Sequence, residues 1–205
     1  MDYDKLASKK DIDKTVAALT AKGFEVFAVE NGAAALAKIK ELIPAGASVM
    51  NGSSRTLEQI GYIDYLKEGK HGWINPKVAI LAEKDKAKQA QLRRQSVLSD
   101  FYLGSVHALA ENGEFLIGSN TASQMPHVVF TSPNLIFVVS TKKIVPTLAD
   151  AMKRLEEHVV PLEDQNMKQR YGMGTALNKV IIFKGESPYN ERKLRMLLVQ
   201  ENLGF

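Results

Sequence analysis

A glutamate stands directly before an Asn-Gly pair at residues 111–113, and the apolar run Phe115-Leu116-Ile117 follows soon after. Asn-Gly is a strong turn signal, so Glu111 is expected at the mouth of a strand. A carboxylate at that place could serve as a nucleophile or a general base if its surroundings bury it. A plain hairpin turn with a solvated glutamate is the more common alternative, and the residues alone leave both open.

A second polar loop follows a predicted strand and leads into a predicted helix. It consists of Asn51, Gly52, Ser53, Ser54, Arg55 and Thr56. Small residues let the backbone approach a ligand, and the free N–H groups at the start of a helix favour an anion. The loop matches neither the Walker A pattern nor the dinucleotide-binding glycine pattern. The favoured interpretation is a turn with a serine N-cap, and anion binding is the alternative.

A third polar loop, at residues 118–127, joins two predicted strands. It contains the small hydrogen-bonding residues Ser119, Asn120 and Thr121 and ends at His127. A single histidine before a buried strand is usually structural. The other three histidines show no metal-ligand spacing and no acidic partner at helical spacing. We therefore predict no metal site.

Hydrophobic periodicity predicts the elements that must position these loops. Strands are expected at residues 24–29, 47–50, 102–105, 114–117, 128–130, 135–140 and 177–183. Helices are expected at residues 4–21, 32–43, 83–98, 146–158 and 190–198, with short helices over 55–72 and a helical turn at 106–109. Residues 78–81 fit a strand or the start of a helix equally well. The strand–helix–strand order near the N-terminus implies parallel pairing. These elements predict one α/β domain over residues 1–205, with a mixed sheet and a helix-rich first half.

Composition sets further limits. Hydrophobic residues make up 45% and charged residues 24% of the 205 residues, the balance of a soluble globular protein. The absence of cysteine excludes thiolate zinc sites, iron–sulfur clusters, a cysteine nucleophile and disulfides. The acidic N-terminus and the lack of an apolar run of ~20 residues predict a cytoplasmic protein with no membrane contact. The net charge of +4 suits a small anionic ligand, while the absence of aromatic residues among the basic ones argues against nucleic acid.

Four stretches, taken in order, resemble the LUD-domain family, whose best-known type is the small protein of the bacterial lactate-utilisation operon. They are residues 52–61, 99–113, 126–129 and 144–151. The fold of that family is the fold of the sugar-phosphate isomerases and CoA transferases. The resemblance therefore implies a Rossmann-like three-layer α/β domain with a mixed, mostly parallel sheet.

Within that superfamily, Glu111-Asn112-Gly113 with Gly118 is similar to the Ser-Glu-Asn-Gly signature of CoA transferases. In those enzymes the glutamate attacks an acyl-CoA and carries the CoA as a thioester. The resemblance makes Glu111 the candidate nucleophile. Two positions depart from the signature, because Ala110 replaces its serine and Glu114 replaces an apolar residue.

Three functions are implied by the resemblance and the loops. The first is support of lactate or related organic-acid utilisation, by binding a small anionic metabolite in a complex with iron–sulfur protein subunits. The second is an enzyme that acts on a CoA thioester or a sugar phosphate through Glu111, and the third is a non-catalytic interaction subunit. No cofactor is predicted, with CoA or a nucleotide-like anion as the alternative, and homo-oligomerisation stays open. The candidate ligand-binding residues are Asn51, Gly52, Ser53, Ser54, Arg55, Thr56, Gly104, Asn112, Gly113, Ser119, Asn120 and Thr121.

Overall fold

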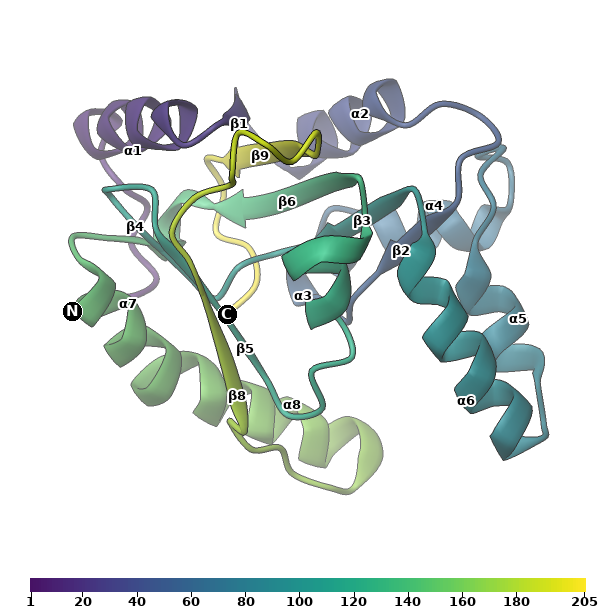
Figure 1. Cartoon of the computed structure of the whole chain (residues 1–205). Coiled ribbons are helices and arrows are strands. Elements are labelled where there is room, and N and C mark those ends of the chain that lie inside the picture. The colour runs from purple at the N-terminus through teal and green to yellow at the C-terminus, as the bar shows by residue number, and fades with distance from the viewer.

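The computed structural model describes residues 1–205, and its centre is a sheet of five parallel strands (Figure 1). In spatial order these are β1 (Phe24–Val29), β9 (Lys193–Val199), β6 (Asn134–Ser140), β3 (Phe101–Gly104) and β2 (Val49–Asn51). All neighbouring strands run parallel, and β6 pairs with β9 along its whole length. The carboxyl ends of the five strands therefore lie at one edge of the sheet.

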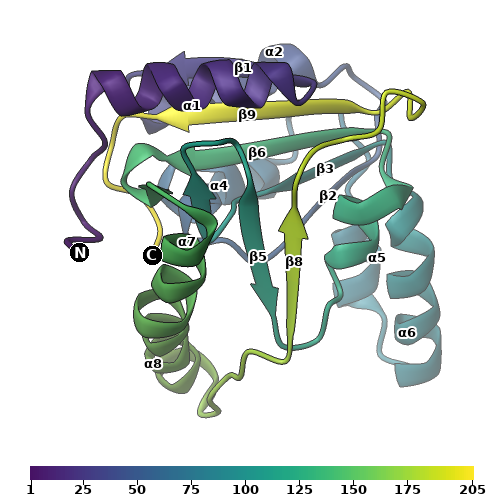
Figure 2. The same ribbon diagram turned by 60° about the vertical axis from the view of Figure 1, so that its left-hand side comes forward.

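A second sheet of four strands packs against one face of the first (Figure 2). Its strands are, in order, β7 (Ile144–Val145), β4 (Ala108–Ala110), β5 (Phe115–Ser119) and β8 (Lys179–Phe183). The β4–β7 pair is parallel and the other two pairs are antiparallel. Phe115 of β5 contacts Phe137 of β6, with ring centroids 5.3 Å apart, and so joins the two sheets.

Helices cover the remaining faces. They are α1 (Lys9–Ala21), α2 (Gly32–Leu42), α3 (Arg55–Gln59), α4 (Tyr62–Glu68), α5 (Pro76–Ala82), α6 (Lys86–Gln95), α7 (Leu148–Arg154) and α8 (Val160–Tyr171). A π-helical turn, η4 (Leu155–Val159), makes α7 and α8 one continuous rod beside the second sheet. Short turns are η1 (Ser96–Leu98), η2 (His127–Thr131) and η3 (Thr141–Lys143). None of these helices has both the length and the apolar character needed to cross a membrane.

The central strands are buried on both faces. In β6, Leu135, Phe137 and Val139 belong to the core shared with α1 and the second sheet. The alternating Ile136 and Val138 belong to the core beneath α2, α3 and α4. Such two-sided burial explains the continuous apolar runs of parallel strands. The predicted α/β class, with a mostly parallel sheet and a helix-rich first half, is confirmed.

The prediction of a helix at residues 190–198 is wrong, because these residues contain β9 in the interior of the central sheet. Leu194, Leu197 and Leu198 fit a helical spacing, but in the strand Leu194 and Leu198 face one core and Leu197 the other. A strand buried on both faces has no two-residue period, so its pattern cannot be told from that of a buried helix.

Two further local predictions fail. Residues 128–130, expected as a strand, lie in the π-helical turn η2. The guanidinium of Arg192 donates to the backbone carbonyls of His127, Val128 and Val129 at 2.8–3.0 Å. Arg192 is far from this turn in the sequence, so no local pattern reveals the contact. Residues 106–109, expected as a helical turn, lead into β4 instead.

The structure also answers whether residues 78–81 form a helix or a strand and whether the first two strands of the chain pair with each other. Residues 78–81 belong to α5 rather than to a strand. The predicted pairing of the strands on either side of α2 is wrong, because β1 and β2 run parallel but lie at opposite edges of the sheet with three strands between them. The second sheet was not predicted.

Candidate functional site

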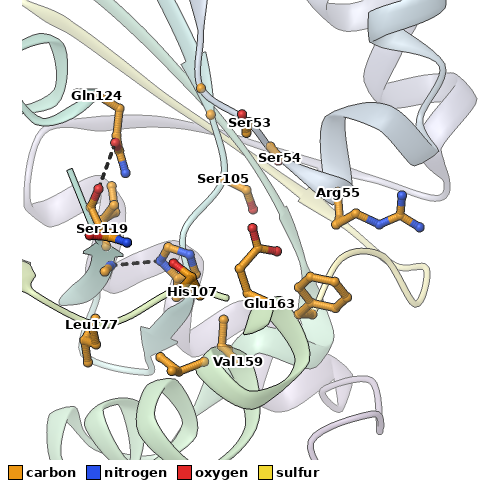
Figure 3. A pocket seen from close by; sticks show the side chains of 18 of the residues that line it. Ser53, Ser54, Arg55, Ser105, His107, Ser119, Gln124, Val159, Glu163 and Leu177 are labelled. Atoms are coloured by element: carbon orange, nitrogen blue, oxygen red, sulfur yellow. Dashed lines mark hydrogen bonds between the residues drawn. The ribbon is translucent and has the colours of Figure 1, made fainter. Parts of the chain in front are cut away.

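A cavity of about 430 Å³ opens beside the carboxyl ends of the central strands (Figure 3). Its lining includes residues 52–56 after β2, residues 104–107 at the end of β3, Lys143 after β6, and residues 204–205 after β9. In α/β sheets, ligands characteristically bind outside the carboxyl ends of the parallel strands. The position and the size of this cavity are those of a small-molecule site.

The opposite wall comes from the second sheet and the helical rod. Residues 117–121, from β5 onward, lie on one side, and Val159, Val160, Glu163 and Met167 lie on the other. Figure 3 shows Ser105, His107 and Glu163 around the same space. Glu163 accepts a hydrogen bond from Asn166. Its negative charge disfavours an anion nearby, whereas the charge of Lys143 favours one.

Lys143 lines the cavity, and it is only 4% exposed. Its Nζ lies 3.0 Å from Ser105 Oγ, 3.1 Å from Thr56 Oγ1 and 3.2 Å from the carbonyl oxygen of Val106. No carboxylate of the protein forms an ion pair with it. Burial is the main cause that lowers its pKa well below 10.5, and the charges of Arg154 and Lys142 add to this.

The three hydrogen-bond partners of Lys143 match the three N–H groups of a protonated amine. When the ammonium is protonated, its three N–H groups can all be used by the two hydroxyls and the carbonyl. The Thr56 hydroxyl then donates to Ser105 Oγ, and the Ser105 hydroxyl donates to the carbonyl of Val106, each at 3.4 Å. A buried ammonium without a counter-ion is unfavourable, and an anion in the cavity would supply the missing charge.

His107 supplies a neutral donor to the same cavity. Its Nδ1 accepts a hydrogen bond from the backbone N–H of Gly118 at 2.9 Å, so its proton resides on Nε2. Burial, with the positive charges of Lys143 and Arg154, lowers the pKa of His107 to about 3. The ring therefore stays uncharged at neutral pH and presents an N–H group.

Gly204 closes the space over the lysine. A Cβ at this position would clash with Thr56 Oγ1 and would lie 2.8 Å from Lys143 Nζ, and its φ of +71° also favours glycine. The absence of a side chain at residue 204 therefore lets the backbone lie close to the amine.

We expect the protein to lose stability steeply below pH 6.5. Burial lowers the pKa of His127 to about 4, and that of His107 is about 3, whereas an unfolded histidine titrates near 6.5. The unfolded chain binds these protons first, so the free energy of unfolding should fall by about 1.4 kcal/mol per pH unit for each histidine. Urea unfolding at pH 7.0 and 5.5 measures this. A double variant, His107→Gln with His127→Gln, should show a shallower pH dependence, and an unchanged slope would contradict the assignment.

The structure brings together two of the three predicted loops. Gly52, Ser53, Ser54, Arg55, Thr56, Gly104, Ser119, Asn120 and Thr121 all line the cavity. Asn51 lies behind them at the end of β2, and its side-chain amide donates to the carbonyl of Gly52 at 2.9 Å. That these residues bind a ligand stays a prediction.

Glu111, Asn112 and Gly113 do not reach the cavity. They form the tip of the β4–β5 hairpin, whereas the cavity lies at the opposite, open end of these strands. A Cβ at Gly113 would lie 3.1 Å from the backbone of Ala18, so the tip packs on α1. Glu111 pairs with Lys14 at 2.6 Å. The three loops therefore do not meet at one site, and the geometry gives no support to Glu111 as a nucleophile.

Replacing Glu111 by glutamine should leave ligand binding and any turnover unchanged. The pair with the exposed Lys14 is a surface ion pair, which contributes about 0–1 kcal/mol to stability. Thermal unfolding and ligand titration of Glu111→Gln check this. A loss of binding or turnover with an intact fold would restore the hairpin tip as part of the site.

The sequence predictions missed Lys143, Ser105 and His107. Ser105 and His107 lie within the family-like stretch at residues 99–113, but they are not among the candidate residues that the sequence predicts. A signal for Lys143 existed, because Thr141-Lys142-Lys143 follows the most apolar strand, and side chains after a buried parallel strand lie at its carboxyl end.

The sequence matches the family model of the LUD domain over residues 12–188. The chain therefore belongs to the LUD domain family, as the four stretches suggested. Among solved structures it is similar to a DUF162 family protein from Deinococcus radiodurans, with 14% sequence identity and a TM-score of 0.57. That similarity covers 95% of this chain and 99% of the other, and at this identity it shows the fold alone. No curated protein matches the sequence.

Proposed function

We propose that this LUD-domain protein binds a small organic anion in the cavity, with Lys143 as its counter-charge, and serves the utilisation of lactate or a related organic acid. The observation that carries the proposal is a buried lysine at the cavity wall with no carboxylate partner. The membership of the LUD domain family supports the metabolic context.

The size of the cavity supports a ligand larger than lactate alone. About 430 Å³ lies within the usual range for small-molecule sites and exceeds what a three-carbon acid fills. A second candidate function, action on an acyl thioester or a sugar phosphate, is favoured by this volume and by the serine and histidine beside Lys143. Such an activity would depend on the residues around Lys143, because Glu111 does not line the cavity.

Iron–sulfur partners are also part of the proposal. Oxidation of lactate needs an electron acceptor, and a chain without cysteine has no thiolates to hold an iron–sulfur cluster. In this account the cluster resides on a partner subunit, while the cavity of this chain handles the anion.

Thermal-shift titration tests anion binding. The probes are L-lactate, pyruvate, ribose 5-phosphate, acetyl-CoA and, as an uncharged control, lactamide. A ligand at 100 times its Kd should add ~2.7 kcal/mol to the free energy of unfolding. Stabilisation by at least one anion, without an effect of lactamide, supports the proposal. No stabilisation by any of the anions up to millimolar concentration would contradict it.

A further inference from the structure

The polar floor of the cavity places a hydroxyl beside a buried amine. Ser105 Oγ lies 3.0 Å from Lys143 Nζ, within the distance at which a base accepts a proton from a nucleophile. Thr56 Oγ1 is at a similar distance, 3.1 Å, but Thr56 is only 1% exposed. Ser105 is partly exposed and lines the cavity (Figure 3), so its oxygen is the one that a substrate can meet.

We infer that Ser105 is a nucleophile activated by Lys143, and that the cavity catalyses acyl transfer from an ester or thioester of a small organic acid. The inference rests on the proposed function, because the acid that leaves the cavity is the anion that the cavity is proposed to bind.

The surroundings of Lys143 fix the position of Nζ and favour its neutral form, as a general base requires. The carbonyl of Val106 at 3.2 Å fixes its orientation, and the backbone of Gly204 lies close to Nζ on another side. The charged groups around it are Arg154 on α7 and Lys142 beside it in the chain, with Arg55 and Glu163 on the cavity lining. Arg154 and Lys142 are cationic and lower the pKa of Lys143, so before the reaction the amine can be neutral and accept a proton. An anion in the cavity favours the ammonium instead, so the same group is the counter-charge once the acid has formed.

His107 is the candidate for stabilising the oxyanion. Its tautomer is fixed by Gly118, which leaves Nε2–H as a donor on a ring that is uncharged. A neutral donor prearranged in a buried cavity stabilises charge that develops on a carbonyl oxygen. The proposed step needs one such donor in addition to the ammonium that forms on Lys143.

The proposed reaction has two stages, acylation of Ser105 and hydrolysis of the acyl-serine, and water is the only co-reactant. Ser105 Oγ forms a bond to the acyl carbon, and its proton moves to Lys143 Nζ. The tetrahedral intermediate collapses with cleavage of the bond to the leaving oxygen or sulfur, which takes the proton from Lys143. Water then attacks the acyl-serine with the neutral amine as base, and this releases the acid and restores the Ser105 hydroxyl.

The apolar part of the lining suits the leaving group. Ile117, Leu155, Met167, Met173 and Leu177 line the same cavity as Lys143. A substrate with a small polar acyl end and a longer, less polar leaving group would therefore fill both parts of the cavity.

The experiment uses mono-4-nitrophenyl succinate as a substrate that carries both a carboxylate and an activated ester, and a fluorophosphonate as a serine label read by mass spectrometry. The wild-type protein should hydrolyse the ester and be labelled at Ser105. Ser105→Ala should lower kcat/KM at least about 100-fold and remove the label, while the variant still unfolds cooperatively on heating. The control variant Ser187→Ala, which removes the hydroxyl of an exposed serine that does not line the cavity, should keep the label on Ser105 and the wild-type rate.

The role of Lys143 has its own readout. In the wild type, kcat should rise with pH as the amine loses its proton, and Lys143→Met should lose this dependence together with about 10²–10⁴-fold in rate. Hydrolysis by Ser105→Ala at the wild-type rate, or a label on another residue, would overturn the inference. Binding of pyruvate without hydrolysis or labelling would overturn acyl transfer alone, whereas labelling without binding of any anion would overturn the proposed function instead.

Discussion

Lys143→Met should abolish the stabilisation that small organic anions give to the wild-type protein. The methionine side chain is similar in length and fits the same buried space, but it removes the only positive charge on the cavity wall that no carboxylate of the protein neutralises. Loss of one partner from a buried charge pair costs about 2–5 kcal/mol, which weakens binding about 30-fold or more. Isothermal titration and thermal shift with the best anion of the panel measure the loss.

The adjacent lysine provides the matched control. Lys142 is equally buried, but its Nζ pairs with Asp4 at 2.9 Å and with Asn202 at 2.7 Å, and it does not line the cavity. Lys142→Met should lower stability and leave the affinity for the anion within a few-fold of wild type. Equal loss of affinity in both variants would mean that net charge, rather than the position of Lys143, governs binding.

The second large effect concerns the pH dependence of stability. Below its lowered pKa, Lys143 is protonated in both the folded and the unfolded state. Between that pKa and 10.5 only the unfolded chain binds the proton, so the free energy of unfolding should rise with pH. The contribution of one group is about 1.4 kcal/mol per pH unit, and it should be missing from Lys143→Met.

Urea unfolding of the two proteins between pH 7 and 9.5 gives this difference directly. The range stops there because burial raises the pKa of Tyr62 and Tyr102, so near pH 10 the unfolded chain begins to lose protons that the folded chain keeps. Parallel curves for wild type and Lys143→Met over the whole range would show that Lys143 is an ordinary charged lysine.

The sequence was sufficient for elements with local signals. The strand at residues 24–29 lies between Gly23 and Asn31-Gly32, and α2 has its Asn31 cap and ends before Pro44, so their bounds follow from local chemistry. The element at residues 193–199 could not be predicted this way, because what makes it a strand is pairing with β1 and β6 on either side. The turn η2 depends in the same way on Arg192, some sixty residues away.

The same limit applies to the site. Residues 52–56 and 119–121 were selected because small polar residues after strands are visible locally, and the structure places both groups on one cavity. Lys143 was not selected, because a lysine in a sequence is normally a surface residue. Its burial results from Gly204, Thr56 and Ser105, which three separate segments bring around it. The prediction that Glu111 belongs to the site gains no support from the structure, because a turn sequence does not show at which end of a hairpin the cavity lies.

The protonation state of Lys143 is the quantity on which the whole account depends, and NMR of protein labelled with carbon-13 lysine measures it. The resonance is identified by its absence from Lys143→Met. In the free protein it should titrate well below 10.5, and addition of a bound anion such as pyruvate should move its titration to higher pH, because the anion supplies the missing counter-charge. A resonance that titrates near 10.5 and does not respond to any anion that binds would contradict the account.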